Sequence, residues 1–283
     1  MTLDRRQILT ALATLGFAAT SARAEQMGFD LRLTNEGLMM PVMVRGRPLQ
    51  GILDCGASAT LMDAQVAESL GLDALETRSG QAVYGRITAG ESAPVSIRAG
   101  DAAYVAPVMI LPMKQVGLTA DMLIGRDILN DWPLDLDGPA RRASFRRQQP
   151  AGGMRPVPLS RSPKGALVID MELEGHPVRA SLDTGANTAL ILRRSWAKRN
   201  GLLHGRSQST ALGGDVNGLR RLTLSPVRDI RLGGIAFNDL SAEISDNVLE
   251  HDVTVGLEVL RRLHSYWDVS AGKLWLMPPS RGI

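Results

Sequence analysis

Thiols and excess charge are both scarce in this sequence of 283 residues. Its single cysteine, Cys55, excludes an intrachain disulfide, a zinc finger and an iron–sulfur cluster held by thiolates. The 32 lysine and arginine residues nearly balance the 29 aspartate and glutamate residues, which leaves a formal net charge of +3. Because nucleic-acid-binding proteins carry a strong and clustered basic excess, we expect no nucleic-acid partner.

Patterns that mark metal, cofactor or acyl-transfer sites are missing too. No G-x-S-x-G nucleophile elbow and no phosphate-binding glycine loop follows an apolar run. The four histidines are scattered, and none shows a metal-ligand spacing such as H-E-x-x-H: they are His176, His204, His251 and His264. We therefore expect neither a metal ion nor a cofactor.

The first 24 residues are typical of an export signal. Arg5-Arg6 precede an apolar run, residues 8–19, and Ala22-Arg23-Ala24 offers a cleavage site of small residues. The run of about 12 residues is shorter than the roughly 20 that span a bilayer, so no stable membrane anchor is expected. The paired arginines favour the twin-arginine route over the general one and predict a periplasmic protein. The alternative interpretation is an N-terminal helix of the fold.

An internal repeat organises the rest of the chain. Residues 46–58 lie 129 positions before residues 175–187, and Gly, Pro, Leu, Asp, Gly and Ala coincide without a gap. Alternating apolar residues upstream of both copies predict strands with one buried face. Short helices are expected near 64–70 and 195–200. The repeat predicts an N-terminal lobe at 25–145, a proline-containing linker at 146–163 and a C-terminal lobe at 164–283.

The identity between the two copies centres on an aspartate followed by glycine. A duplicated β domain that serves only as a scaffold would match mainly at apolar positions. Gly56 and Gly185 allow tight turns and close backbone approach, and pseudo-twofold symmetry would bring equivalent loops together at the axis. We therefore expect Asp54 to lie opposite Asp183.

Two facing aspartates have a defined chemistry. Carboxylates about 3 Å apart repel by roughly 5 kcal/mol at an effective dielectric constant of 20, so the pair would share one proton. One member can then accept a proton from water while the other donates to a carbonyl oxygen. This chemistry hydrolyses an amide without a metal or a covalent intermediate.

These residues carry a family resemblance. Asp183-Thr184-Gly185-Ala186 resembles the Asp-Thr-Gly-Ala signature of the retropepsin-like aspartic proteases, and residues 123–129 (LIGRDIL) are similar to the second signature of that family. Thr254-Val255-Gly256 is a looser copy of the second signature. The resemblance covers residues 38–145 and 166–276, nearly all of the chain after the export signal.

The resemblance implies both fold and activity. The implied fold is mainly β, with two homologous β-barrel lobes related by pseudo-twofold symmetry and short helices. The implied activity is that of an aspartic endopeptidase with Asp54 and Asp183 as catalytic residues, acting on peptides or unfolded proteins. A chain that holds both halves need not dimerise, so we expect a monomer.

Flaps, which are hairpins that close over the bound peptide, are also implied by the resemblance. Tyr84-Gly85 begins 30 residues after Asp54, and Gly213-Gly214 begins 30 residues after Asp183, so these pairs are the candidate tips. The alternative for Tyr84 is an ordinary exposed tyrosine of a hairpin.

The first Asp loop departs from the family pattern at Cys55, where the family has threonine. A thiol is a weaker donor with longer bonds, so the loop formed by Cys55, Gly56 and Ala57 should be held less rigidly than the loop of Thr184, Gly185 and Ala186. Cys55 is interpreted as a tolerated small buried residue, as a redox-sensitive site, or as the mark of a weakened enzyme.

Alanine at positions 57 and 186 carries a second expectation. Pepsin-like enzymes often have a serine or threonine there, whose hydroxyl favours the charged form of the aspartate pair. Its loss should raise the pH at which the pair titrates, which predicts a pH optimum of about 5–6.

The competing hypothesis is a peptide-binding protein that kept the cleft but lost efficient catalysis. Retention of both aspartates favours the enzyme, because a binding cleft gains little from burying two carboxylates that repel each other.

Overall fold

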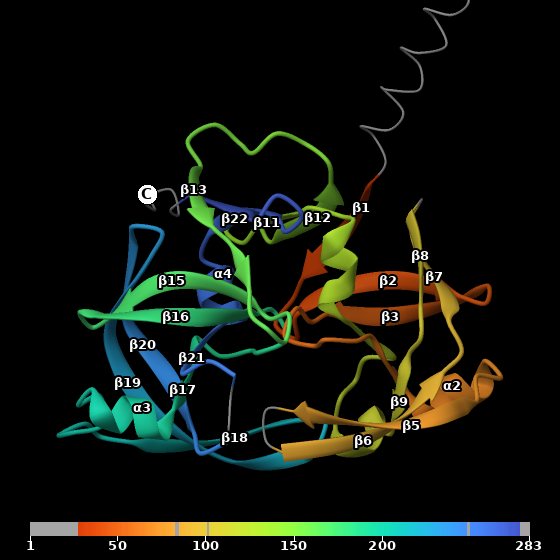
Figure 1. Cartoon of the computed structure of the whole chain (residues 1–283), viewed down its shortest axis with the longest axis horizontal. Coiled ribbons are helices and arrows are strands. Elements are labelled where there is room, and N and C mark those ends of the chain that lie inside the picture. Colours follow the sequence, from red (N-terminus) through yellow and green to blue (C-terminus); the bar gives the residue numbers. More distant parts are fainter. Residues whose placement is uncertain (1–27, 83–84, 101, 248–249, 278–283) are drawn as a thin grey trace, which may run out of the picture.

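The computed structural model describes residues 28–82, 85–100, 102–247 and 250–277 (Figure 1). The expected export signal and Tyr84 lie outside the described residues. Within these ranges the strands form two sheets of 15 and 8 strands, and only short helices accompany them. The expectation of a mainly β fold with two homologous halves is confirmed.

The first half contains twelve strands, one α-helix and two 3-10 helices within the described residues. They are β1 (Gly28–Leu33), β2 (Leu38–Val44), β3 (Arg47–Leu53), β4 (Leu61–Asp63), α2 (Ala64–Ser69), β5 (Ala74–Ala82), β6 (Gly85–Ser92), β7 (Val95–Ala99), β8 (Ala102–Ala106), β9 (Met109–Leu111), η1 (Met113–Val116), β10 (Met122–Ile124), η2 (Arg126–Asn130), β11 (Leu134–Asp137) and β12 (Arg142–Arg146).

The second half contains eleven strands and two helices within the described residues. They are β13 (Arg155–Pro158), β14 (Ser160–Arg161), β15 (Leu167–Leu173), β16 (His176–Asp183), β17 (Leu190–Arg193), α3 (Arg194–Arg199), β18 (Ser209–Asp215), β19 (Gly218–Leu232), β20 (Ile235–Ser245), β21 (Val253–Gly256), α4 (Leu257–Leu260), β22 (His264–Asp268) and β23 (Lys273–Met277).

The two halves repeat the same strand pairing. In the first half, β3 pairs parallel with β10, β10 antiparallel with β4, and β4 parallel with β9. In the second half, β16, β21, β17 and β20 pair in the same order and directions. Where the first half uses the separate strands β6 and β7, the second half has the single long strand β19. Closure of each half into a barrel stays a prediction.

The predicted linker carries strands of its own. Its residues 155–158 form β13, which pairs with β23, and residues 160–161 form β14, which pairs with β15. Prolines 156 and 158 are tolerated because β13 lies at the edge of its sheet. The order β13-β23-β22-β11-β12-β1 makes a shared layer, called here the interlobe sheet, which lies at the top of Figure 1. The predicted lobe boundaries themselves stay a prediction.

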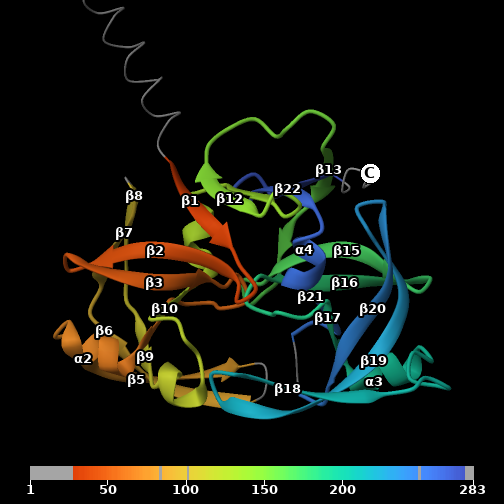
Figure 2. The ribbon, with the colours of Figure 1, turned by 180° about the vertical axis from the view of Figure 1, so that it is seen from behind.

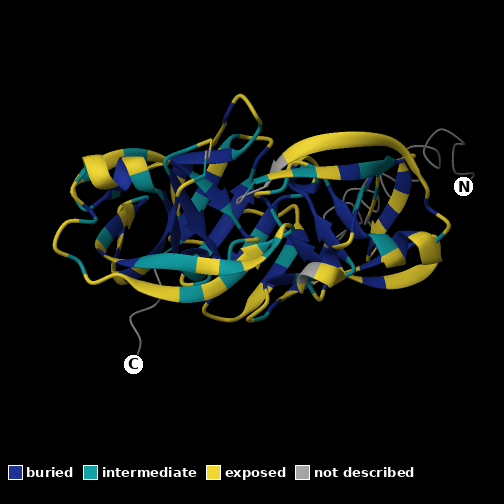
Figure 3. Ribbon diagram, turned by 90° about the horizontal axis from the view of Figure 1, so that it is seen from below, coloured by how far each residue is buried: buried dark blue, intermediate teal, exposed yellow. Residues whose placement is uncertain are grey.

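Periodicity placed the buried faces and helices correctly. The four alternate residues of β2 from Leu38 to Val44 are buried, and one core cluster extends through both halves. Figure 3 shows buried segments inside each half and exposed strands around them. Helices α2 and α3 begin within one residue of their expected positions, and Gly71 and Gly201 end them with φ of +62° and +72°. No helix in the described part of the chain is long and apolar enough to cross a membrane.

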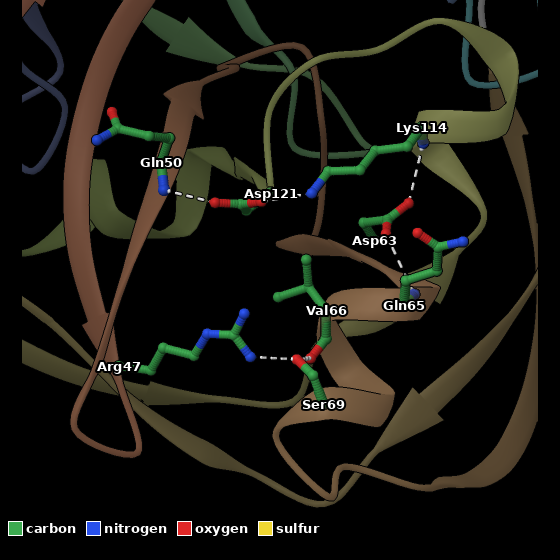
Figure 4. A network of polar contacts seen from close by, with 8 residues as sticks. All are labelled: Arg47, Gln50, Asp63, Gln65, Val66, Ser69, Lys114 and Asp121. Carbon is green, nitrogen blue, oxygen red and sulfur yellow. Dashed lines mark hydrogen bonds and ion pairs between the residues drawn. The ribbon is translucent and has the colours of Figure 1, made fainter.

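Two buried or half-buried carboxylates tie the helices of the first half to its strands (Figure 4). Asp63 caps α2 by accepting from the Gln65 amide at 3.1 Å and also accepts from the Lys114 amide at 2.9 Å. Asp121 accepts from the Gln50 amide at 3.0 Å and from Lys114 Nζ at 2.7 Å. These contacts hold β3 and β4 in place on either side of the loop that contains Asp54.

Candidate active site

Asp54 and Asp183 lie at the ends of equivalent strands. Asp54 follows β3, whose last residue, Leu53, is fully buried, and Asp183 is the last residue of β16. Each strand is paired in parallel with the strand of the second signature: Leu53 lies opposite Ile124 of β10, and Asp183 lies opposite Gly256 of β21. Figure 2 shows that β3 and β16 run toward each other in the middle of the molecule, where the two halves meet.

The two loops approach so closely that only glycine fits beside each aspartate. A Cβ built on Gly56 would stand 2.5 Å from Cγ of Asp183, and one built on Gly185 would stand 2.4 Å from Cγ of Asp54. Such distances are far below van der Waals contact, so each carboxyl group occupies the space that a side chain would take in the opposite loop. The expectation that glycine serves close approach therefore has a direct geometric basis.

Each carboxyl group is held by backbone donors of its own loop. Oδ1 of Asp54 accepts from the amides of Gly56 at 2.9 Å and Ala57 at 3.0 Å. Oδ1 of Asp183 accepts from the amides of Gly185 and Ala186 at 2.8 and 3.2 Å. The two carboxyl groups are also hydrogen-bonded to each other, and the Gly56 amide contributes a backbone hydrogen bond to Asp183.

Burial raises the pKa of both aspartates above the ordinary value of 3.8. For Asp54 the negative charge of Asp183 raises the pKa further, while the amide donors of Ala57 and Gly56 oppose the shift. Two acids in this arrangement hold one proton between them over a broad pH range. The site therefore presents one carboxylate and one carboxylic acid side by side, as a proton-transfer dyad requires.

The loops interlock through Thr184 and Cys55. Thr184 Oγ1 donates to the Leu53 carbonyl at 2.9 Å and accepts from the Cys55 amide at 3.0 Å. In return, Cys55 Sγ donates to the Leu182 carbonyl at 3.4 Å and accepts from the Thr184 amide at 3.2 Å. The thiol makes the same bonds as a hydroxyl at greater length, as expected for sulfur.

Cys55 is expected to be unreactive in the folded protein. The side chain is 1% exposed, and burial, with the nearby charge of Asp183, raises the pKa of the thiol to about 12. Because the thiolate is the reactive species, iodoacetamide at pH 8 should modify Cys55 only after unfolding. Mass spectrometry with and without denaturant measures this, and rapid labelling of the native protein would restore the interpretation as a redox-sensitive site.

A cavity of about 340 Å³ opens beside the dyad. Its lining is mainly apolar and comes largely from the first half: Asp54, Gly56, Ala57, Ser58, Ala59, Leu61, Arg78, Ser79, Gly80, Ile87, Ala89, Met109, Leu123, Asp183, Asp215 and Val216. Strands β5–β6 (the first hairpin) and β18–β19 (the second hairpin) therefore both reach the cavity, and they approach each other at the bottom of Figure 1. The cavity therefore lies between residues of the two hairpins and the paired acids.

The candidate flap residues fall differently in the two hairpins. Gly85 is the first residue of β6 and pairs with Ala82 of β5, and a Cβ built on it would lie 3.9 Å from Nδ2 of Asn217. In the second hairpin Gly213 and Gly214 lie within β18, paired with Arg220 and Leu219, and the turn comes later, at residues 216–217. The residues that reach the cavity from this hairpin are Asp215 and Val216.

Sequence reasoning missed Arg126, which contacts the first Asp loop. Its side chain is 7% exposed and donates to the Gly56 carbonyl at 3.0 Å and to the Lys164 carbonyl at 2.6 Å. The signal was present, because Arg126 follows Gly125 where the second half has an apolar residue, Leu257, after Gly256.

A larger cavity of about 460 Å³ lies on the interlobe sheet, away from the dyad. Its charged side chains are already paired: His264 contacts Asp135 at 2.8 Å, and Arg146 contacts Asp30 at 2.6 Å. We therefore take the cavity beside the dyad, and not this larger one, as the candidate active site. Among the described residues, no group of three or more His, Cys, Asp or Glu side chains is arranged to hold a metal ion.

Two homologous β halves that each present an Asp-x-Gly-Ala loop, interlocked at a shared cleft, define the class of aspartic proteases. Comparison with family models agrees with this geometry. A family model described as aspartyl protease matches residues 40–128 and again residues 169–259, together more than half of the chain. The chain belongs to the aspartyl protease family, with two tandem retropepsin-like halves. No curated protein matches the sequence significantly.

Proposed function

We propose that this protein is an aspartic endopeptidase that hydrolyses peptide bonds with a water molecule activated between Asp54 and Asp183. The observation that carries the proposal is the facing pair of carboxyl groups, each in the space left by the glycine of the opposite loop. A structural role does not account for such a pair, because two buried acids without a catalytic purpose destabilise the fold.

The proposed reaction needs only the dyad and a bound peptide. The ionised carboxylate takes a proton from water, and the water oxygen attacks the scissile carbonyl carbon. The protonated carboxyl group donates to the carbonyl oxygen, which gives a neutral tetrahedral intermediate. This intermediate collapses when the carboxyl group that received the proton of water passes it to the amide nitrogen, the other aspartate takes a proton from a hydroxyl of the intermediate, and the C–N bond breaks to give an amine and a carboxylic acid. The dyad then again holds one proton.

The cavity supports a peptide with a bulky apolar side chain next to the scissile bond. Alanines 57, 59 and 89 widen the cavity, and Leu61, Ile87, Met109, Leu123 and Val216 supply its apolar walls. Peptides or unfolded proteins are the proposed substrates, because an extended chain must lie between the two hairpins and the dyad.

The test is digestion of casein or a peptide library by the wild type, Asp54→Asn and Asp183→Asn, with and without a statine-type inhibitor. The proposal predicts cleavage by the wild type that the inhibitor blocks and that both substitutions abolish. Cleavage that survives either substitution would overturn it.

The second candidate function is a catalytically weakened or inactive peptide-binding protein. The longer bonds of Cys55 in the interlock favour this candidate, since they hold the first loop less tightly than a threonine would. Tight peptide binding without turnover in the wild type supports it. Turnover that appears only in Cys55→Thr would identify the thiol as the cause.

We expect the rate of hydrolysis to peak at about pH 5–6. Burial raises the pKa of both aspartates, and alanine at 57 and 186 leaves no hydroxyl there to stabilise the charged form. A profile of kcat/KM against pH measures this, and a peak below about pH 3.5 contradicts the expectation.

We also propose a periplasmic monomer that is exported by the twin-arginine route. The paired arginines and the cleavage site in residues 1–24 support the route. N-terminal sequencing of protein recovered from the periplasm tests it, with an Arg5→Lys/Arg6→Lys variant as control.

Light scattering at micromolar concentration tests the proposal that the protein is a monomer.

A further inference from the structure

The first Asp loop is attached to the second half of the molecule by a buried cation. Arg126 donates through Nη1 to the Gly56 carbonyl at 3.0 Å and through Nη2 to the Lys164 carbonyl at 2.6 Å. Gly56 belongs to the loop of Asp54, and Lys164 belongs to the turn before β15 in the second half. One guanidinium therefore bridges the catalytic loop of one lobe and the backbone of the other.

The turn around Lys164 is shaped to receive this guanidinium. Gly165 has a φ of +81°, and a Cβ built on it would stand 3.3 Å from Nη2 of Arg126. The Ser162 carbonyl accepts from the Gly165 amide at 2.8 Å, and the Lys164 amide donates to Glu250 Oε1 at 3.2 Å. Hydrogen bonds on both sides therefore fix the backbone that accepts from Arg126, and the contact between Arg126 and Lys164 has a defined geometry.

The peptide group that Arg126 contacts also contacts the dyad. The Gly56 carbonyl and the Ala57 amide belong to one peptide bond, and that amide donates to Oδ1 of Asp54 at 3.0 Å. A donor on the carbonyl polarises the peptide and strengthens the hydrogen bond made by its N–H. Through this peptide group, the guanidinium of Arg126 holds the Asp54 carboxyl group in position and places a positive charge near it.

The described residues of the second lobe show no equivalent of this link, although the backbone is equivalent. The amide of Arg126 donates to the Ala57 carbonyl at 3.1 Å, and the amide of Leu257 donates to the Ala186 carbonyl at 2.8 Å. The residue at the place of Arg126 is thus an apolar leucine. The Ala186 amide reaches Asp183 at 3.2 Å, longer than the 3.0 Å on the side with the arginine.

We propose that Arg126 is a positioning residue that fixes the Asp54 loop against the second lobe and supplies a fixed positive charge beneath the dyad. The expected effect of Arg126 on the titration of the carboxyl groups does not depend on the proposed peptidase function, whereas its expected effect on turnover rests on that function. The charged and titratable groups that face the guanidinium are Asp54, Cys55, Arg161 and Glu250. Arg161 and Glu250 carry opposite charges, and both are unchanged in the Arg126 variants. A shift in the titration of the dyad in those variants therefore reports the loss of Arg126 itself.

Two substitutions separate charge from geometry. Arg126→Leu installs the residue of the other lobe and removes both functions, whereas Arg126→Lys keeps the charge but cannot reach two carbonyls at once. Arg161→Leu is the matched control, because Arg161 donates to the carbonyl of Gly165 at 3.3 Å in the same turn but has no bond to the Asp54 loop.

The dyad titration is read by carbon-13 NMR of the aspartate carboxyl groups, assigned with Asp54→Asn and Asp183→Asn. Removing a nearby cation disfavours the carboxylate, so the lower of the two titration steps should move upward by about one pH unit in Arg126→Leu. It should stay in place in Arg126→Lys and Arg161→Leu. An unchanged titration in a folded Arg126→Leu protein overturns the charge role, whether or not the protein cleaves peptides.

Turnover is read as kcat and KM on a peptide that the wild type cleaves. Misplacing the Asp54 loop should lower kcat by about 10- to 100-fold in Arg126→Leu, with a partial loss in Arg126→Lys and little change in KM. Arg161→Leu should match the wild type. Full kcat in Arg126→Leu overturns the positioning role. If no variant and no wild type cleaves any peptide, the proposed peptidase function fails, and the NMR titration still decides the electrostatic half of the proposal.

Discussion

Gly56→Ala is expected to lower kcat for peptide hydrolysis by at least about 100-fold, because the new methyl group would occupy the position of the opposite carboxyl group. It would lie 2.5 Å from Cγ and 2.6 Å from both carboxyl oxygens of Asp183. The neighbour is a side chain that is itself fixed by two amide donors, so it cannot move without losing them. The overpacking should also lower the free energy of unfolding by about 1–3 kcal/mol.

Gly185→Ala should have the same effect, since its methyl group would meet Asp54 at 2.4 Å. The matched control is Gly152→Ala, because nothing lies within 4 Å of a Cβ at Gly152 and its φ is ordinary. Steady-state kinetics with a fluorogenic peptide and thermal unfolding measure both effects. Retention of full kcat in either dyad-loop variant, with a folded protein, would show that the carboxyl groups do not need this packing.

Unfolding free energy is expected to fall as the pH rises from 5 to 8, by about 1.4 kcal/mol for each pH unit in which the folded dyad holds one more proton than the unfolded chain. Burial raises the pKa of Asp54 and Asp183, so the folded protein keeps a proton that the unfolded chain has already released. The unfolded state then binds fewer protons, and stability declines with pH. The stability that the protonated dyad contributes is fully present below the ordinary aspartate pKa of 3.8, and it is lost as the pH rises through the raised pKa of the folded dyad.

Asp54→Asn should reduce this slope. The neutral amide removes the repulsion between two carboxylates, so only the rise in pKa that its own burial gives Asp183 remains, and ionisation opposes folding less between pH 5 and 8. Urea unfolding of both proteins at pH 5, 6, 7 and 8 measures the difference in slope. Other shifted groups, such as His251, whose pKa burial lowers, contribute equally to both proteins and cancel. Parallel slopes would contradict the shared proton.

Much of the fold followed from local pattern and repetition. Alternating burial in β2 and the helix ends at Gly71 and Gly201 depend on residues that are neighbours in sequence, where spacing and left-handed glycine conformations act directly. The facing position of Asp54 and Asp183 also followed, because a repeat of 129 residues implies symmetry-related loops.

Other parts depended on contacts between distant segments. Composition indicated a linker at residues 146–163, but two edges of existing sheets were available there, and β13 and β14 pair with them. The glycine pair at 213–214 suggested a hairpin tip, yet the strand continues through it because Gly213 makes room for Leu222, whose Cδ1 would lie 2.4 Å from an added Cβ.

Arg126 illustrates the same limit most clearly. Nothing near it in sequence specifies a partner, and both of its acceptors are backbone carbonyls, 70 residues before it and 38 residues after it. Carbonyl acceptors leave no mark on residue identity, so an arginine that binds them cannot be paired by reading side chains.

The order of residues alone determined that two acid-bearing loops exist, that they are equivalent, and that each is preceded by a buried strand. Periodicity and duplication are properties of neighbouring positions, and they are visible before the chain folds. Only the folded molecule decided how near the acids come, that a thiol completes their interlock, and that one arginine joins the lobes beneath them. Those features arise from distances between segments more than a hundred residues apart or from bonds to the main chain, which the sequence does not encode locally.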